Sequence, residues 1–129
     1  MKHETESFIA ALEKAFGPVG KLKCTPTVLN KGNPDANLSI RKFALLFGVD
    51  YNELAFGGDK GIKIKGRFQE TQKETTINFY RTKSRGDYRI SISGLEQHAR
   101  PWDIIAMRRC VITGALIINA TKETGGDNG

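Results

Sequence analysis

Residues 61–93, GIKIKGRFQETQKETTINFYRTKSRGDYRISIS, decide the fold of this chain. In the first and last parts of the stretch, apolar residues alternate with polar ones: Ile62, Ile64 and Phe68, then Tyr88, Ile90 and Ile92. Alternation with a period of two is typical of strands with one buried face. A third run, TTINFYRT at 75–82, is rich in β-branched and aromatic residues, and polar turns separate the three runs. The stretch therefore predicts three successive strands, with a bulge where Gly66 interrupts the first.

The segment before this stretch predicts two helices, with two short strands and a polar loop between them. The first helix ends at Gly17-Pro18 and has apolar residues at helical spacing: Phe8, Ile9, Leu12, Ala15 and Phe16. LKCTPTVL, from Leu22 to Leu29, predicts an edge or bent strand because Pro26 cannot donate to a sheet ladder. A polar loop over 30–37 and a short strand over 38–40 follow. RKFALLFG predicts a short helix that Gly48 ends, with a further turn over 50–54.

The rest of the chain completes a mainly β fold. Strands are predicted over 102–107 and 111–118, and the polar, Gly-rich residues 122–129 form a tail or the start of a linker. The run 57–61, GGDKG, predicts a tight turn because it lacks the spacing of a phosphate-binding loop. About seven short strands with one or two helices predict a small β-barrel domain over residues 1–121. Four aromatic residues are assigned to its core: Phe43, Phe47, Phe79 and Trp102.

Composition excludes several classes of protein. Apolar residues make up 39% and charged residues 26% of the 129 residues, as in an ordinary soluble domain. No apolar run approaches the roughly 18 residues that cross a bilayer. The acidic start is unlike a secretory signal. Cys24 and Cys110 belong to no C-x-x-C pair, which argues against zinc ribbons and disulfide scaffolds. We expect a cytoplasmic protein with no membrane partner.

The positive charge is concentrated in one quarter of the chain. The chain has 20 Lys and Arg against 14 Asp and Glu, a net charge of +6. Residues 60–90 hold nine of these bases and three of the acids, and nine minus three is also +6. A concentrated basic segment is typical of a polyanion site. Solvated charges on the outer face of strands are the alternative.

The sequence carries no enzyme motif. His3 and His98 have no Cys, His or carboxylate partner at the spacing of a metal site. A nuclease motif of the PD…(D/E)-x-K type, starting at Asp35, would need an acid where Lys63 stands. We therefore expect no catalytic residue, no metal and no cofactor.

The strongest functional signal is RTKSRGDYRI, residues 81–90, which places Asp87 between Arg85 and Arg89. The planar fork of arginine matches the guanine edge or a phosphate. An acid between arginines can orient them, or can accept a hydrogen bond from cytosine N4. A turn between two strands would carry these groups into the major groove. A solvated hairpin end with an incidental Asp–Arg pair is the alternative.

The run from Leu38 to Ile92 resembles the N-terminal effector DNA-binding domain of EcoRII-type restriction endonucleases. The order of elements matches, and Lys83 to Ile90 meets the family's arm pattern, Lys-x-Arg-x-acid-x-Arg followed by an apolar residue. Asp103 to Ile105 resembles the family's closing strand. Tyr88 departs from the pattern where a further Lys can occur. The family fold is a pseudobarrel related to the plant B3 domain, in which two arms grip the major groove.

The resemblance implies a non-catalytic, sequence-specific module for double-stranded DNA in a restriction endonuclease. It would act as a monomer, with a nuclease domain covalently linked to it. The C-terminal arm would be Lys83 to Arg89. Six residues in and next to it would bind DNA: Arg81, Lys83, Arg85, Asp87, Tyr88 and Arg89. Of these, Arg85 and Arg89 would contact base edges and Asp87 would orient them or read cytosine.

The remaining contacts that the resemblance implies are to phosphates and adenine edges. Lys83 and Arg81 would contact phosphates. The polar loop over 30–37 would be the N-terminal arm, from which Lys31, Asn33 and Asn37 would reach phosphates or adenine edges.

Two other functions fit the same residues. An OB-like barrel that binds single-stranded DNA or RNA would expose stacking aromatics, for which Phe68, Phe79 and Tyr80 are the candidates. A basic protein-interaction or inhibitor module would present the hairpin to an acidic partner and would have no affinity for DNA.

Overall fold

The structure, a computed structural model, describes residues 14, 19–31 and 34–122. Within these residues the strands are β1 (Gly20–Lys23), β2 (Gly57–Phe68), β3 (Glu74–Arg81), β4 (Tyr88–Ile92), β5 (Ile104–Arg109) and β6 (Leu116–Thr121). The helical segments are α2 (Pro26–Lys31), α3 (Leu38–Ala44) and the 3-10 turns η1 (Leu45–Phe47), η2 (Tyr51–Glu53) and η3 (Leu95–Gln97). None of these helices has the length and apolar character that a bilayer crossing requires. The predicted helix from Phe8 to Phe16 falls outside the described residues, apart from position 14.

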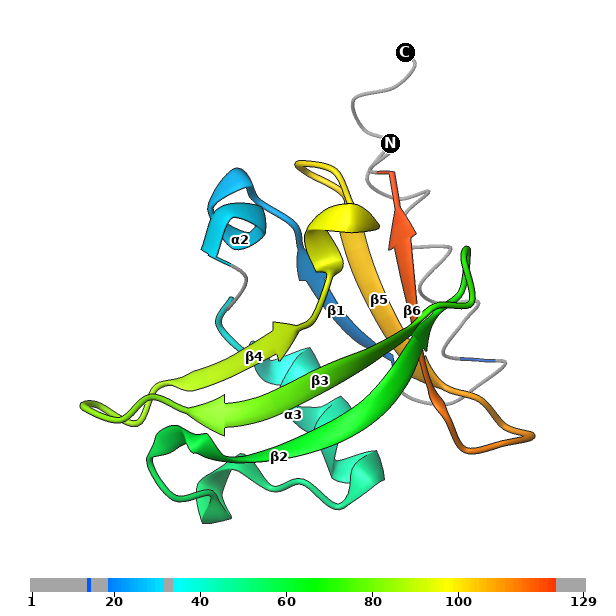
Figure 1. Cartoon of the computed structure of the whole chain (residues 1–129). Coiled ribbons are helices and arrows are strands. Elements are labelled where there is room, and N and C mark those ends of the chain that lie inside the picture. Colours follow the sequence, from blue (N-terminus) through cyan, green and yellow to red (C-terminus); the bar gives the residue numbers. More distant parts are fainter. Residues whose placement is uncertain (1–13, 15–18, 32–33, 123–129) are drawn as a thin grey trace.

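The described strands form one sheet in the order β1-β5-β6-β2-β3-β4. Neighbouring strands are antiparallel, except that β2 and β6 run parallel. The sheet curls into a half-barrel, with β2, β3 and β4 on one side and β1, β5 and β6 on the other (Figure 1). The prediction of a mainly β, pseudobarrel-like fold is therefore confirmed, with six strands in the described residues where about seven were predicted.

The core lies on the concave side of this curled sheet. Alternate residues of β3 and β4 face inward, and Ile77, Phe79 and Ile90 have no exposed surface. Helix α3 packs its buried Phe43 against them, and a Cβ at Gly20 of β1 would lie only 3.0 Å from the Cβ of Phe43. Burial of each large apolar side chain contributes about 1.5–3 kcal/mol. The packed helix and strands give the β3–β4 hairpin a rigid base.

Residues Leu38–Ile40 begin α3, so the prediction of a strand there is wrong. Asn37 caps the helix: its Oδ1 accepts a hydrogen bond from the Ile40 N–H at 3.0 Å, and its Nδ2 donates to the Lys21 carbonyl at 2.8 Å. The cap supplies a partner for a free N–H of the first turn, which favours helix over strand. The helix predicted to end at Gly48 is confirmed, since Gly48 has a left-handed φ of 78°. The turn predicted over 50–54 corresponds to η2.

Strand β1 ends at Lys23, so the predicted strand from Leu22 to Leu29 is wrong beyond its first two residues. Pro26 begins α2 instead of bending a strand. Proline is favoured in the first turn of a helix because the missing N–H has no partner there in any case. The Thr25 hydroxyl supports this start by accepting a hydrogen bond from the Val28 N–H at 3.2 Å.

The last two strands begin later than predicted. Trp102 belongs to a turn with φ of 74° and is 53% exposed, so its assignment to the core is wrong. Phe43 and Phe79 are fully buried as predicted, and Phe47 is half-buried against the core. Residues 111–113, predicted as strand, form the turn between β5 and β6.

The glycine-rich run 57–61 is the first part of β2 and not the predicted tight turn. Gly57 pairs with Arg81 and Ile62 pairs with Phe79, so five steps along β2 match two steps along β3. Five minus two leaves three extra residues, which form a large, irregular bulge. A bulge is present in β2, but at its start and not at Gly66 as predicted.

The bulge packs against the outer face of the sheet, opposite the core. Asn78 Nδ2 donates a hydrogen bond to the Gly58 carbonyl at 3.0 Å. A Cβ at Gly61 would lie 2.5 Å from the carbonyl oxygen of Phe79, whereas a Cβ at Gly58 would meet its nearest atom at 3.7 Å. The close approach therefore requires glycine at position 61 but tolerates a side chain at position 58.

These contacts predict unequal losses of stability for two alanine substitutions in one segment. Gly61→Ala forces its Cβ into the β3 backbone and is expected to lower the free energy of unfolding by about 1–3 kcal/mol. Gly58→Ala, the matched control, is expected to change it by less than about 0.5 kcal/mol. Urea denaturation followed by circular dichroism measures both. Equal stability of the two variants would contradict the described path of the bulge.

Candidate nucleic-acid interface

The β3–β4 hairpin ends in a loop, residues 82–87, that is closed by its own hydrogen bonds. The Thr82 N–H donates to the Asp87 carbonyl, and the Gly86 N–H donates to the Thr82 carbonyl, each at 2.9 Å. The Thr82 hydroxyl accepts from the Asp87 N–H at 2.8 Å. Gly86 has a left-handed φ of 72°, which glycine adopts without steric cost. The loop projects from the end of the sheet (Figure 1) and presents Lys83 and Arg85 to solvent.

Arg81 fixes the base of this loop. Its Nε donates to the Gly86 carbonyl at 2.8 Å. Its guanidinium carbon lies 4.6 Å from the ring centroid of Phe56 and 4.9 Å from that of Tyr88. Cation–π contacts contribute about 0.5–1 kcal/mol each at partly exposed sites. Arg81, which was expected to contact phosphate, is therefore engaged within the hairpin, and it joins the loop to the segment before β2.

Tyr88 packs on the inner side of the hairpin. Its ring contacts the guanidinium of Arg41 at 4.8 Å and the ring of Tyr51 edge-to-face at 5.5 Å. Its hydroxyl donates to Asn52 Oδ1 at 3.0 Å. Tyr51 in turn donates to the Arg89 carbonyl at 2.8 Å, and burial raises the pKa of Tyr51 well above its usual range, so it remains a donor. These contacts make Tyr88 a support for the start of β4.

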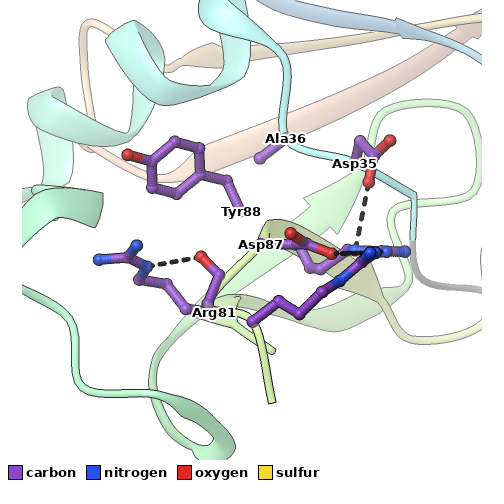
Figure 2. A pocket seen from close by; sticks show the side chains of 8 residues that line it. Asp35, Ala36, Arg81, Asp87 and Tyr88 are labelled. Carbon is purple, nitrogen blue, oxygen red and sulfur yellow. Dashed lines mark hydrogen bonds and ion pairs between the residues drawn. The ribbon is translucent and has the colours of Figure 1, made fainter. Parts of the chain in front are cut away.

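Two carboxylates organise the arginines beside the loop. Asp87 Oδ2 lies 3.0 Å from Arg85 Nη2 and 3.5 Å from Arg89 Nη2. Asp35 Oδ1 lies 3.2 Å from Arg89 Nε, and Figure 2 shows Asp35 and Asp87 facing the same arginine cluster. The Arg85 side chain is 77% exposed, whereas that of Arg89 is 29% exposed. Arg85 is thus the arginine of this cluster that is presented outward.

The segment 34–36 lies along the free edge of β4. The Ala36 N–H donates to the Tyr88 carbonyl, and the Ile90 N–H donates to the Pro34 carbonyl, each at 3.0 Å. Asp35 is thereby held opposite Arg89. Asp35, Ala36 and the hairpin border an open hollow of about 490 Å³. Residues 34–36, the described end of the predicted N-terminal loop, therefore lie beside the start of β4.

The residues predicted for the N-terminal arm have different outcomes. Asn37 uses both ends of its side-chain amide to cap α3 and to bind the Lys21 carbonyl, so its geometry is that of a structural residue. Lys31 is the last residue of α2. Asn33 lies outside the described residues. The residue of this loop that does lie next to the hairpin is Asp35. The sequence interpretation did not assign Asp35 to DNA binding.

Asp35 and Phe56 are the site residues that sequence reasoning missed. Both reach the hairpin through long-range pairing, since Asp35 bridges to Arg89 and Phe56 bridges to Arg81. Neither residue lies in a motif with Arg81 or Arg89. No sequence signal pointed to either pairing; the structure shows that Phe56 requires glycine at position 86, because a Cβ there would collide with its ring.

The aromatic residues that a single-strand binder would expose are mostly covered. Phe68 is 4% exposed and Phe79 is fully buried, while Tyr80 is half-buried. Phe68 stacks on His98 with ring centroids 3.7 Å apart, and the His98 ring nitrogens lie near the Thr71 hydroxyl and the Gly94 carbonyl. Phe68 and Phe79 therefore offer no exposed ring on which a base could stack, whereas Tyr80 is partly accessible on the outer face.

The two cysteines differ in their surroundings. Cys24 is buried, and burial raises the pKa of its thiol, with the nearby Asp103 adding to the effect. Cys110 is partly exposed in the β5–β6 turn, where hydrogen bonds from Thr113 lower its pKa to about 7. In the described ranges, no three His, Cys, Asp or Glu side chains gather as metal ligands would. Cys110 is thus the more reactive thiol of the pair.

Comparisons with known proteins add no relative to this picture. No protein-family model matches the chain, and no curated protein or solved structure is significantly similar to it. The function of the chain is therefore inferred from the geometry and charge of the hairpin.

The lowered pKa of Cys110 predicts the pH dependence of its alkylation. The thiolate is the nucleophile, so a lowered pKa populates it at lower pH. We expect iodoacetamide to label Cys110 alone, with a rate that rises to half its maximum near the pKa of about 7. Thr113→Ala should move this midpoint upward, and Cys110→Ser should abolish labelling. Comparable labelling of Cys24 at neutral pH would contradict its burial.

Proposed function

We propose that this chain is a sequence-specific, non-catalytic binding domain for double-stranded DNA that reads the major groove with the β3–β4 hairpin. The observation that carries the proposal is the arrangement of Arg85. Its guanidinium is 77% exposed at the end of a projecting hairpin, yet it is held by Asp87 at 3.0 Å. A guanidinium that points outward and is already held in one orientation is suited to form hydrogen bonds with a ligand of fixed geometry.

The chemistry of this arrangement fits a base pair edge. Arginine donates two parallel hydrogen bonds to O6 and N7 of guanine, which is the commonest specific contact in the major groove. Asp87 engages one Nη of Arg85 and leaves further donors of the fork for the base. Holding the side chain in advance reduces the conformational entropy lost on binding. Lys83, exposed in the same loop, contacts a phosphate.

The other members of the cluster have supporting roles in this proposal. Arg89 lies between Asp87 and Asp35, so it holds the two carboxylates in place and contacts DNA less than Arg85 does. Arg81 keeps the loop attached to Phe56 and Tyr88. This division of roles differs from the initial expectation, in which Arg89 contacted a base edge and Arg81 a phosphate.

The resemblance to the EcoRII-type effector domain gives the proposal its biological setting. In that setting the chain is the specificity module of a restriction endonuclease, monomeric as a module, and cleavage belongs to a linked nuclease domain. The mainly β half-barrel and the hairpin at its end support this setting. The site contains no group that we assign to catalysis.

Binding of labelled oligonucleotide pools tests the proposal directly. The wild-type chain is expected to bind random duplexes better than random single strands and to enrich a short motif. Arg85→Ala should weaken binding to that motif by about 5- to 150-fold, the equivalent of about 1–3 kcal/mol for a lost base contact. Arg100→Ala removes the same charge from an exposed position in a different loop and is the matched control.

The contrary outcomes are distinct. Equal or better binding of single strands would favour the OB-like alternative. No binding of any nucleic acid at low salt would favour a protein partner for the basic hairpin. An Arg85→Ala variant that still enriches the same motif would remove Arg85 from the reading site.

A further inference from the structure

The register of the sheet points to a second contact surface for the same ligand. We propose that the outer face of β2, β3 and β4, led by Lys63, Lys65 and Arg67, binds the phosphate backbone of the duplex whose bases the hairpin reads. This inference rests on the proposed function, and it assigns to DNA binding a set of residues outside the segment 81–89.

The pairing of the strands places the basic residues on one face. Residues directly opposite each other in an antiparallel ladder point to the same side of the sheet, and alternate residues of one strand share that side. The pairs on the outer face are Tyr80 with Arg89, Asn78 with Ser91, Lys63 with Asn78, Lys65 with Thr76, and Arg67 with Glu74. The basic side chains of β2 therefore share a face with Arg89, which pairs with Asp87 at the hairpin.

The charges on this face are available to a ligand. Lys63, Lys65 and Arg67 are exposed, and no ion pair involves them within the described part of the chain. Across from the lysines, β3 presents the neutral side chains of Thr76 and Asn78. A lysine ammonium is a compact charge on a flexible stem, which suits a phosphate oxygen and carries no sequence preference. Positive charge therefore outweighs negative charge over the middle of this face.

The bulge at the start of β2 extends the same surface. The hydrogen bond from Asn78 to the Gly58 carbonyl holds the bulge on the outer face, and it presents Lys60 and Asp59 as exposed neighbours. Glu74, opposite Arg67, is the acid at the far end. The basic residues thus run from the hairpin along β2.

The length of the strands fixes the span that a ligand must cover. Glu74 and Arg81 are the ends of β3, and seven steps of about 3.3 Å separate them by about 23 Å. At about 3.4 Å per base pair, this equals roughly seven base pairs beyond the hairpin contact. A duplex of 5 base pairs spans about 17 Å and ends before Arg67 when it contacts the hairpin, whereas a duplex of 24 base pairs also reaches Arg67. Duplex length therefore becomes a test of the face.

The experiment compares random duplexes of 5 base pairs, each closed by a covalent linker so that it stays paired, with random duplexes of 24 base pairs over a range of salt concentrations. The test variant is Lys63→Gln with Lys65→Gln and Arg67→Gln. The matched control is Lys42→Gln with Arg100→Gln and Arg109→Gln, which removes the same charge from exposed positions on α3, a loop and β5. Circular dichroism and thermal melting establish that both variants are folded. Motif enrichment is measured in parallel, with Arg85→Ala beside them.

We expect the test variant to lose about 10- to 100-fold in affinity for the 24-base-pair duplex. Its slope of log affinity against log salt should fall by about 2–3, since each lost phosphate contact removes about 0.9. Its loss of affinity for the 5-base-pair duplex should be several-fold smaller, and the enriched motif should be unchanged. Compared with the test variant, the control should stay closer to the wild type in its slope of log affinity against log salt and in the ratio of its affinities for the long and short duplexes.

The failures of the two proposals give different results. A test variant with the wild-type slope and length dependence, beside an Arg85→Ala variant that loses the motif, would overturn the basic face and leave the hairpin reading intact. A wild-type chain that binds no duplex would overturn the proposed function and this inference with it. Equal losses in the test and control variants would show a general charge effect and would also overturn the face.

Discussion

The position of the Arg81 guanidinium is the interaction on which the rest of the hairpin depends. It lies against the rings of Phe56 and Tyr88 and donates to the Gly86 carbonyl, so one side chain joins the segment before β2, the tip of the hairpin and the start of β4. The close packing of the Phe56 ring against the loop requires glycine at position 86, because a Cβ there would meet the ring. With the backbone of the loop fixed in this way, Asp87 can hold Arg85 in one direction while Arg85 stays exposed.

Local sequence signals predicted the parts of the fold that depend on neighbours in the chain. The alternation in β2 and β4 and the turn around Gly86 identified the hairpin and its strands correctly. The sequence interpretation was wrong where a single side chain decides between helix and strand. Asn37 caps α3 and so converts the predicted strand Leu38–Ile40 to helix. Pro26 begins a helix instead of bending a strand.

The sequence predicted which charged residues of the hairpin lie close together, but not which residues from other segments contact them. The order Arg85, Asp87, Arg89 in the chain indicated that a carboxylate would lie between arginines, and the structure has it so. The second carboxylate, Asp35, and the ring of Phe56 reach the hairpin through pairing across the sheet, which no local pattern reveals. The bulge at 57–61 was missed for the same reason, because Gly61 is needed for contact with β3 and not for a turn.

The central claim is that the hairpin and the neighbouring edge of β4 contact duplex DNA. An NMR titration of the ¹⁵N-labelled chain with a duplex carrying the enriched motif tests it most directly. The account predicts that shifted amides cluster at 82–89 and 34–36 and continue along β2, while those of η3 and the β5–β6 turn stay in place. Shifts centred on Trp102 or on the exposed Val111 and Ile112, with the hairpin amides unmoved, would contradict it.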